Sequence, residues 1–534
     1  MLAKCINTGS LHQTLITLLD HPTVSFPLLS QIHALLISSG LSKRHPFASK
    51  LFSFVADSGN ADYTHRLLLH NPSNSVVHWN RVIRLFCNTP TPYNSINVFV
   101  EMQRFGVVPD YFTFPSLAKA SARLGSIEHG VSLHCVVFKS GYELDVFIQN
   151  SLIHMYASCG EILYARKVFD EMPQRTTVTW NSMLDGYAKC GDLERAQEVF
   201  EFAPVKDIVS WSSLIDGYVK GGEYGEAMKV FERMEVEGDI KANEVTMVSV
   251  LGACSHLGAL EQGRSMHRYI IENKLPLNLV LLTSLVDMYA KCGAIEEALV
   301  LFRGIPKDKT DVLLWNAIIG GLASHGYVQE SLDLFAEMLM VQVVPNEITY
   351  LCLLSACAHR GLVKEAWEFL DSLERSGMKP KSEHYACMID VLARAGQVVE
   401  AYDFMNKMPL EPTPATLGAL LSGCMSHGRL DLAEQLGKKL VEVDPHHDGR
   451  YVGLSNVYAA IRRWDEAKMM RQTMDITGMK KFPGFSCVEI SGALEMFKAH
   501  DRWHPNSAEI VMMINFIFRQ MKKVSDCDEG NMLY

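Results

Sequence analysis

"TWNSMLDGYAKCGDLERAQEVF", residues 179–200, is followed thirty-one residues later by a near copy, "SWSSLIDGYVKGGEYGEAMKVF", residues 210–231. In the first copy Trp180, Leu184 and Tyr187 lie at i, i+4 and i+7, so they share one face of a helix. The repeated spacing predicts that the same helix, with the same apolar face, forms more than once along the chain.

A second helix is expected to follow a glycine stop within the same stretch. Gly191 ends the first helix, because glycine enters the left-handed C-terminal cap without a steric cost. Asp192 is the expected N-cap of the second helix, whose apolar face carries Leu193, Ala196 and Phe200. The stretch therefore predicts a helical hairpin.

The pattern continues in both directions from this hairpin, with unit lengths that vary. A single hairpin of this size cannot bury its apolar face alone, so neighbouring units must stack into a solenoid. Small residues four positions before a Phe suit close helix approach at the stack, at Ala165, Ala196, Ala227 and Ala298. We expect an all-α fold with units at 76–110, 111–145, 146–176, 177–207, 208–243, 244–278, 279–311, 312–346, 347–381 and 382–413. Degenerate units are expected at 30–75, and two more follow 413.

Composition favours a folded chain and excludes several classes of protein. Among 534 residues, 48% are hydrophobic and 21% are charged, which is far from the polar bias of disorder. No apolar run reaches the length of a membrane span, so we expect no membrane association. The net charge is −10, which excludes an overall basic surface for nucleic acid. Any RNA site must therefore be local.

The cysteine and histidine patterns argue against a metal or catalytic centre. None of the 13 cysteines forms a C-x-x-C pair and none of the 20 histidines begins an H-x-E. Cys159, Cys190 and Cys292 each precede a Gly in one repeat slot, which is typical of a small buried residue. No Gly-rich phosphate loop or nucleophile motif appears. We expect no cofactor, no small-molecule substrate and no enzymatic activity.

The words inside the units resemble one repeat family. "VTWNSMLDGYAKCGDLERAQEVF" and "LLWNAIIGGLASHGYVQESLDLFAEMLMVQVVPN" resemble pentatricopeptide repeats, and the mixture of long and short units resembles the long-and-short subclass of land-plant organelles. The resemblance spans roughly residues 30 to 520. It implies a right-handed superhelix of hairpins that binds single-stranded RNA, one base per unit.

In that family, position five and the last position of each unit select the base. Asn, Ser and Thr can hydrogen-bond a base edge there, although Asn and Asp at unit ends are also ordinary cap and turn residues. The resemblance implies the following pairs: Asn80 with Asp110 and Asn181 with Asp207 for uridine, Ser212 with Asn243 for adenosine, Thr283 with Asp311 for guanosine, Asn316 with Asn346 for a pyrimidine with cytidine preferred, and Asn150 with Thr176 for a pyrimidine.

Other positions extend or weaken this register. Apolar side chains at position two, such as Val178, Val209 and Val280, are expected to clasp bases, with a local basic strip beside them. Pro115, Val248, Leu351 and Ala386 occupy position five of the remaining units and offer no side-chain hydrogen bond. With the amino-terminal unit at the 5′ end, as in the family, the expected target is U-N-Y-U-A-N-G-Y-N-N.

The carboxyl-terminal words resemble those of plant editing factors. Residues 414–483 are similar to the E1 and E2 motifs, residues 484–523 are similar to the E+ motif, and 524–534 form a tail. Cys487 and Val488 depart from the family's more frequent Ser-Trp. Full-length members continue into a DYW-type cytidine deaminase, which needs H-x-E and C-x-x-C. Because this chain has neither, we expect a deaminase to act in trans.

Three functions fit these observations. The first is an RNA-binding adaptor that specifies cytidine-to-uridine editing in organelle transcripts, with a DYW-type deaminase and multiple organellar RNA editing factors as partners. The second is a splicing or stability factor that binds RNA in the same way. The third is a protein-binding scaffold of the tetratricopeptide kind, which leaves the Asn/Asp register unexplained.

The amino-terminal segment carries weak targeting information. Residues 1–29 are a possible targeting segment. The first forty residues contain one basic side chain, Lys4, and one acidic side chain, Asp20, so this part of the chain is acid-poor but lacks the Arg content of a transit peptide. The resemblance implies an organelle, with the mitochondrion favoured over the chloroplast.

Overall fold

The computed structural model describes residues 26–38, 45–70, 75–238, 240–479, 485–490, 493–498 and 506–530. The chain divides into two compact units, Met1–Ser249 and Val250–Tyr534. The expected targeting segment 1–29 lies largely outside the described residues, as does the end of the tail. Each compact unit is described below by itself.

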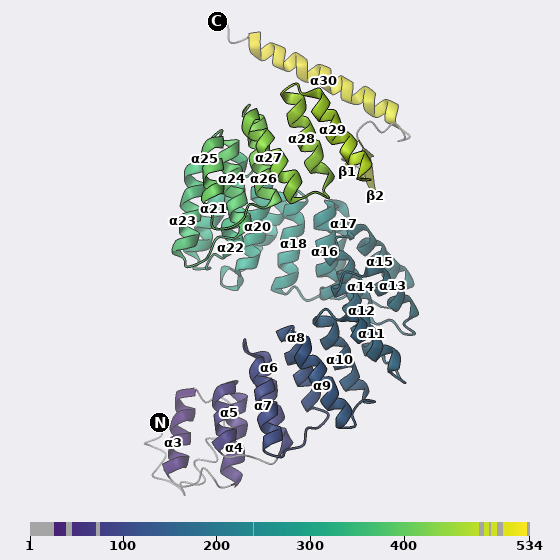
Figure 1. Cartoon of the computed structure of the whole chain (residues 1–534), viewed down its shortest axis with the longest axis vertical. Coiled ribbons are helices and arrows are strands. Elements are labelled where there is room, and N and C mark those ends of the chain that lie inside the picture. The colour runs from purple at the N-terminus through teal and green to yellow at the C-terminus, as the bar shows by residue number, and fades with distance from the viewer. Residues whose placement is uncertain are drawn as a thin grey trace. The chain divides into compact units, whose positions relative to one another are not determined.

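The first compact unit consists of paired antiparallel helices (Figure 1). Its helices are α3 (Phe26–Ser38), α4 (His45–Asp57), α5 (Ala61–His70), α6 (Val76–Asn88), α7 (Tyr93–Arg104), α8 (Thr113–Leu124), α9 (Ile127–Lys139), α10 (Val146–Ser158), α11 (Ile162–Glu171), α12 (Thr177–Lys189), α13 (Leu193–Phe202), α14 (Ile208–Lys220), α15 (Tyr224–Glu237) and the start of α16 (Glu244–Leu257).

The second compact unit continues the same pairing. It contains α17 (Leu260–Glu272), α18 (Leu279–Lys291), α19 (Ile295–Gly304), the 3₁₀ turn η1 (Lys307–Lys309), α20 (Val312–Ser324), α21 (Val328–Met340), α22 (Glu347–Arg360), α23 (Val363–Arg375), α24 (Ser382–Arg394), α25 (Val398–Lys407), α26 (Pro414–Ser426), α27 (Leu430–Val443), α28 (Asp448–Ala460), α29 (Trp464–Ile476), β1 (Phe485–Ile490), β2 (Ala493–Lys498) and α30 (Ser507–Gly530).

The helical hairpin expected from residues 179–200 is confirmed. Helix α12 ends at Lys189, and Gly191 takes the left-handed conformation with φ of 78°. The Asp192 side chain then accepts a hydrogen bond from the Arg195 backbone N–H at 3.2 Å and caps α13. The local signals in the sequence therefore set both helices of this unit.

Adjacent hairpins pack through one recurring interface. Helix α10 packs against α8, α11 and α12, and in the second compact unit α22 packs against α20, α23 and α24. The Phe that closes one hairpin meets the Trp that opens the next edge to face, as in Phe169–Trp180 at 5.0 Å and Phe200–Trp211 at 4.8 Å between ring centroids. This contact explains why the sequence repeats.

Small residues allow the backbones to approach closely. Ala165, Ala196, Ala227 and Ala298 are fully buried, as expected. A Cβ atom added at Gly186 of α12 would lie 2.9 Å from the Ala157 Cβ of α10, so a larger residue there would force the helices apart. The stack therefore depends on volume as well as on hydrophobicity.

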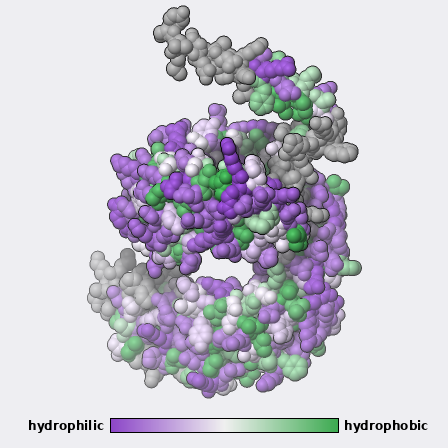
Figure 2. Space-filling model, turned by 45° about the horizontal axis from the view of Figure 1, so that its top comes forward, coloured by the Kyte–Doolittle hydropathy of each residue, from purple (hydrophilic) through white to green (hydrophobic). Residues whose placement is uncertain are grey.

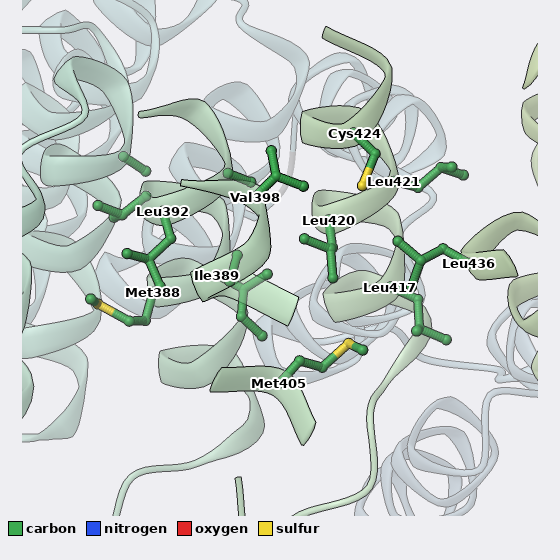
Figure 3. Packing of buried hydrophobic residues seen from close by; sticks show 14 of the residues in the cluster. Met388, Ile389, Leu392, Val398, Met405, Leu417, Leu420, Leu421, Cys424 and Leu436 are labelled. Atoms are coloured by element: carbon green, nitrogen blue, oxygen red, sulfur yellow. The ribbon is translucent and has the colours of Figure 1, made fainter. Parts of the chain in front are cut away.

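The core of the second compact unit is built from the same facing stripes. Met388, Ile389 and Leu392 of α24 pack with Leu417 and Leu420 of α26 in one apolar cluster (Figure 3). All five side chains are fully buried.

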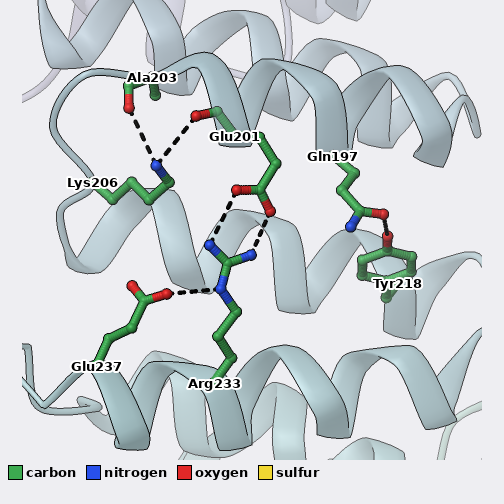
Figure 4. A network of polar contacts seen from close by, with 7 residues as sticks. All are labelled: Gln197, Glu201, Ala203, Lys206, Tyr218, Arg233 and Glu237. Atoms are coloured by element: carbon green, nitrogen blue, oxygen red, sulfur yellow. Dashed lines mark hydrogen bonds and ion pairs between the residues drawn. The ribbon is translucent and has the colours of Figure 1, made fainter.

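Ion pairs between second helices accompany this packing on the surface. Arg233 of α15 binds Glu201 of α13 and, at 2.7 Å, Glu237 (Figure 4). Arg303 binds Glu337 in the same way at 2.6 Å. Exposed pairs of this kind contribute about 0–1 kcal/mol each, so the apolar contacts dominate.

A two-stranded hairpin follows the helical array. Strands β1 and β2 pair antiparallel, with Phe485 opposite Lys498. The sequence analysis predicted an all-α fold and did not predict these strands.

The cysteines of the recurrent slot before Gly are less buried than expected. Cys190 is exposed and Cys159 and Cys292 are only half-buried, so the expectation of buried cysteines in this slot is wrong. The Cys159 and Cys292 thiols instead lie 3.8 and 3.6 Å from the Ser121 and Cys254 carbonyl oxygens of the preceding units.

In the part of the chain that the structure describes, no helix is long and apolar enough to cross a membrane.

Candidate nucleic-acid interface

The pair at the start of the array is joined by a direct hydrogen bond. Asn80 lies on the first turns of α6, and its Nδ2 donates to Asp110 Oδ1 at 2.7 Å. The same carboxylate oxygen accepts the backbone N–H groups of Phe112 and Thr113 at 3.0 and 3.1 Å. Asp110 therefore holds the turn that leads into α8 and binds Asn80 through the same oxygen, so the structural and the base-reading interpretations of the unit-end acid are compatible.

The pair Asn181 and Asp207 repeats this geometry in the unit 177–207. Asn181 Nδ2 donates to Asp207 Oδ1 at 2.9 Å, and Asp207 caps α14 through the Ser210 N–H. Burial raises the pKa of Asp207, but the hydrogen bonds from Ser210, Asn181 and Val209 outweigh this effect, so the pKa lies below the ordinary 3.8. The carboxylate is held as an anion.

In the second compact unit Asn316 and Asn346 form the same contact. Asn316 Nδ2 donates to Asn346 Oδ1 at 3.0 Å, and Asn346 caps α22 through the Thr349 N–H at 3.1 Å. Asn80, Asn181 and Asn316 are between 6% and 9% exposed. Each amide therefore presents only an edge to a ligand.

The two pairs without a position-five Asn are arranged differently. Ser212 reaches Asn243 indirectly, because its hydroxyl lies 2.7 Å from Thr246 Oγ1, which donates to Asn243 Oδ1 at 3.0 Å. Thr283 donates to the Leu279 carbonyl of its own helix at 2.8 Å, while Asp311 caps α20. Among the described residues no hydrogen bond joins Thr283 to Asp311.

The unit 146–176 also lacks the direct contact. Asn150 Oδ1 is buried without a hydrogen-bond partner. Thr176 instead forms a capping box with Thr179, with the two hydroxyls 3.2 Å apart. Among the residues that the structure describes, no hydrogen bond therefore joins Asn150 to Thr176.

Position two carries an exposed apolar side chain in every unit from 76–110 to 347–381. Val178, Val209 and Val280 are each more than half exposed, as a base-clasping role requires. The same holds for six residues not singled out from the sequence: Val77, Phe112, Phe147, Val245, Leu313 and Ile348. Their common spacing in the register was the signal that could have identified them.

The first of these position-two side chains line an open pocket together with Asn80 and Asp110. An open pocket of about 620 Å³ is lined by Val77 and Phe112 together with Asn80, Asp110 and Arg84, among others. Two apolar walls flanking a polar edge suit a planar base that is stacked and hydrogen-bonded at once.

A basic side chain recurs eight residues after position five on the first helix of five units. Lys189, Lys220, Lys291 and Arg394 each pair with an Asp four residues earlier, at 2.6, 2.6, 2.8 and 2.9 Å, and Arg123 occupies the same slot. Residues at these spacings share the broad face of the helix that carries positions two and five. The recurrent spacing of an Asp four residues before a Lys or Arg was the sequence signal for these side chains.

Comparisons with known proteins identify the family of the chain. The pentatricopeptide repeat model matches residues 150–176, 178–204, 209–239, 280–309, 348–378 and 383–411, a PPR repeat family model matches 310–359, and the E motif model matches 427–489. Pentatricopeptide repeat-containing protein At5g08305 of Arabidopsis thaliana is 58% identical over 96% of both chains. The chain belongs to the pentatricopeptide repeat family.

Other relatives of this pentatricopeptide repeat protein carry organelle names. At2g22410, mitochondrial, is 37% identical over 90% of this chain and 70% of its own length, and At2g42920, chloroplastic, is 39% identical over 96% and 92%; both are from Arabidopsis thaliana. Among solved structures, maize PPR10 is 17% identical with a TM-score of 0.42, over 90% of this chain and 78% of that chain.

Proposed function

We propose that this pentatricopeptide repeat protein is a sequence-specific single-stranded RNA-binding adaptor that specifies C-to-U editing sites in organelle transcripts. The observation that carries the proposal is the register of position-five and last-position side chains between exposed apolar residues. Asn80 with Asp110, Asn181 with Asp207 and Asn316 with Asn346 share one hydrogen-bond geometry. A protein-binding scaffold has no need of that register.

Each unit would read one base. The amide edge of a position-five Asn can hydrogen-bond the Watson–Crick edge of a pyrimidine, and the position-two side chains above and below would clasp the base. Ser212 with Asn243 would read adenosine and Thr283 with Asp311 guanosine. The proposed word remains U-N-Y-U-A-N-G-Y-N-N, read from the amino-terminal end.

The recurrent basic side chains would hold the phosphates, although each paired cation already has an aspartate neighbour. Single-stranded nucleic acid contributes a slope of about −0.7 per neutralised phosphate in log K against log salt. Five cations therefore give a slope of about −3.5. A slope steeper than about −6 in a filter-binding titration would contradict a mechanism based mainly on stacking and hydrogen bonds.

The carboxyl-terminal region would recruit the chemistry. We propose boundaries of 76–413 for the repeat array, 414–483 for E1/E2 and 484–523 for E+. Seven apolar side chains of α30 are 46% or more exposed: Val511, Met512, Met513, Ile514, Phe516, Ile517 and Phe518. Figure 2 shows hydrophobic surface on this helix. Such a surface suits protein partners, here a DYW-type cytidine deaminase in trans and organellar RNA editing factors.

The proposal is tested in a null line of the source plant, with the mitochondrion as the first compartment to examine and the chloroplast as the alternative. Sequencing of organelle transcripts should show that conversion is lost at one or a few cytidines just 3′ of the proposed word, and that the wild-type gene restores it. Intact editing with unspliced or shortened transcripts would overturn the editing role in favour of splicing or stabilisation.

A further inference from the structure

A third side chain joins the base-selecting pair in four units. It lies at position three of the following unit and is always a hydroxyl. Thr113 Oγ1 donates to Asn80 Oδ1 at 2.7 Å, Ser210 Oγ to Asn181 Oδ1 at 2.7 Å, and Thr349 Oγ1 to Asn316 Oδ1 at 2.7 Å. The Thr246 and Ser212 hydroxyls lie 2.7 Å apart in the fourth case.

The hydroxyl and the last residue hold opposite ends of the Asn amide. The acid or amide of the last residue takes a hydrogen from Nδ2, and the hydroxyl gives its hydrogen to Oδ1. The hydroxyl is itself held, because Ser210 Oγ accepts the Asp207 backbone N–H at 3.1 Å. Thr113 and Thr349 accept the equivalent N–H at 3.0 and 3.1 Å. Both ends of the amide are therefore anchored to the helix that opens the next unit.

Where this arrangement is incomplete, the Asn is left unsatisfied. The Thr179 hydroxyl stands at position three after the unit 146–176, but it pairs with Thr176, and Asn150 Oδ1 has no hydrogen-bond partner. A position-three hydroxyl alone thus does not orient the amide. The orientation requires the hydroxyl and a last-position acceptor together.

We propose that Thr113, Ser210 and Thr349 are positioning residues that set the pyrimidine specificity of the preceding unit by fixing the amide of its position-five Asn. This inference rests on the proposed RNA-binding function and adds a third position to each base-reading site. Part of the site that selects one base is therefore supplied by the neighbouring unit.

The chemistry of the pyrimidines explains why orientation matters. Uracil presents N3–H as a donor and O2 and O4 as acceptors, whereas cytosine presents N3 as an acceptor and N4–H₂ as a donor. An amide held at both ends offers one N–H and one oxygen lone pair in fixed directions. An amide held only at Nδ2 can turn about that contact and accept either base, so loss of the hydroxyl should reduce the preference for U over C.

The test compares Ser210→Ala with wild type in the full-length protein. Fluorescence anisotropy with synthetic RNAs of the proposed word, carrying U or C at the fourth letter, gives the U-over-C ratio of dissociation constants. We expect Ser210→Ala to lower this ratio about five-fold, which is the worth of one net hydrogen bond, and to leave the ratio at the first letter unchanged. Ser210→Thr should restore the wild-type ratio.

The control removes the same type of helix cap where there is no amide to orient. Thr416 forms a capping box with Thr413 after the unit 382–413, whose position five is Ala386. Thr416→Val should therefore remove a helix-capping hydroxyl as Ser210→Ala does, and it should leave the U-over-C ratio of dissociation constants unchanged at every letter. Thr113→Val, read at the first letter with Thr113→Ser as its rescue, provides an independent variant if Ser210→Ala folds poorly.

The outcomes separate the two proposals. If wild type prefers U and Ser210→Ala keeps the same preference, the positioning role is overturned and the RNA-binding function stands. If wild type shows no preference between U and C at the first or fourth letter, the proposed base reading fails and this inference falls with it. A fall in the ratio that is confined to the letter of the mutated unit supports the inference.

Discussion

Two adjacent units, 146–176 and 177–207, have the same position-five residue but different surroundings for it. Asn181 is held at both ends by Asp207 and Ser210, whereas Asn150 has a buried oxygen without a partner. Both units are followed by a position-three hydroxyl. The difference therefore comes from the last residue, because the Thr176 hydroxyl engages Thr179 and offers no carboxylate to Asn150.

The packing of these two units is nearly identical. Ala165 and Ala196 are both fully buried, and Phe169 and Phe200 each meet the Trp of the next unit. The comparison separates what the repeat shares, a packing interface, from what varies, a polar site. The following changes test that separation.

The largest effect is expected from the shared interface. Ala165→Leu and Ala196→Leu each add volume where helices touch, and overpacking typically costs about 1–3 kcal/mol in the free energy of unfolding. Urea denaturation followed by circular dichroism should show similar losses for both. Leu163→Ala, at a side chain that is 72% exposed, should change little. Unequal losses at the two alanines would show that the interfaces are not equivalent.

The second effect concerns the polar site of the unit 177–207. Asn181→Thr with Asp207 kept creates the pair proposed to read guanosine, so the ratio of affinities for G over U at the fourth letter should rise about ten-fold. Asn150→Thr, which has no acidic last residue, should not produce a G preference at the third letter. An unchanged fourth-letter preference in an anisotropy titration would contradict base reading by this pair.

The third change makes the weaker unit resemble its neighbour. Thr176→Asp supplies a carboxylate for Asn150 Nδ2 and retains an N-cap for α12, so the preference for U at the third letter should increase about five-fold. Thr176→Ser keeps the hydroxyl and should produce no gain. Equal binding by the two variants would show that the last residue does not control the amide.

The smallest effect comes from the tyrosine slot that the two units share. Tyr156 OH lies 2.9 Å from His134 Nδ1, whereas Tyr187 faces the Arg166 guanidinium. Burial lowers the pKa of His134 below 6.5, and Lys167 adds to this effect while Glu171 opposes it. The unfolded chain therefore binds a proton more readily, and the free energy of unfolding should fall as the pH decreases from about 6.5 through the folded-state pKa.

His134→Gln removes this titration and should flatten the pH dependence between pH 7.5 and 5.5. Denaturant unfolding of both proteins at the two pH values measures the difference. Parallel pH profiles for the variant and the wild type would exclude His134 as a source of acid sensitivity.

Local signals in the sequence were sufficient for the helices of a unit. The stop at Gly191 and the cap at Asp192 depend on neighbours within four residues, and both were predictable. The choice of positions two and five as base-reading positions came from the resemblance to pentatricopeptide repeats, and it stays a prediction. Contacts that cross from one unit to the next, such as Ser210 with Asn181, depend on the distance between helices and could not be read from spacing alone.

The strands β1 and β2 were missed for a different reason. Their sequences, "FSCVEI" and "ALEMFK", are six residues each. Segments of this length are too short for hydrophobic periodicity to distinguish a strand from a helix. The resemblance of this stretch to the E+ motif therefore did not predict its secondary structure. The apolar character of α30 was visible in the sequence, but its exposure was not.

The nearest-neighbour packing of α10, α12 and α14 has an evolutionary consequence. Because α12 packs against α10 and α14 through equivalent surfaces, an in-frame deletion of residues 177–207 would bring together two faces that already fit one another. Recombination between such units could shorten or lengthen the array without redesigning its core. Under the proposed code, each such event would remove or add one nucleotide in the recognised footprint, and new target sites would become accessible in single genetic steps.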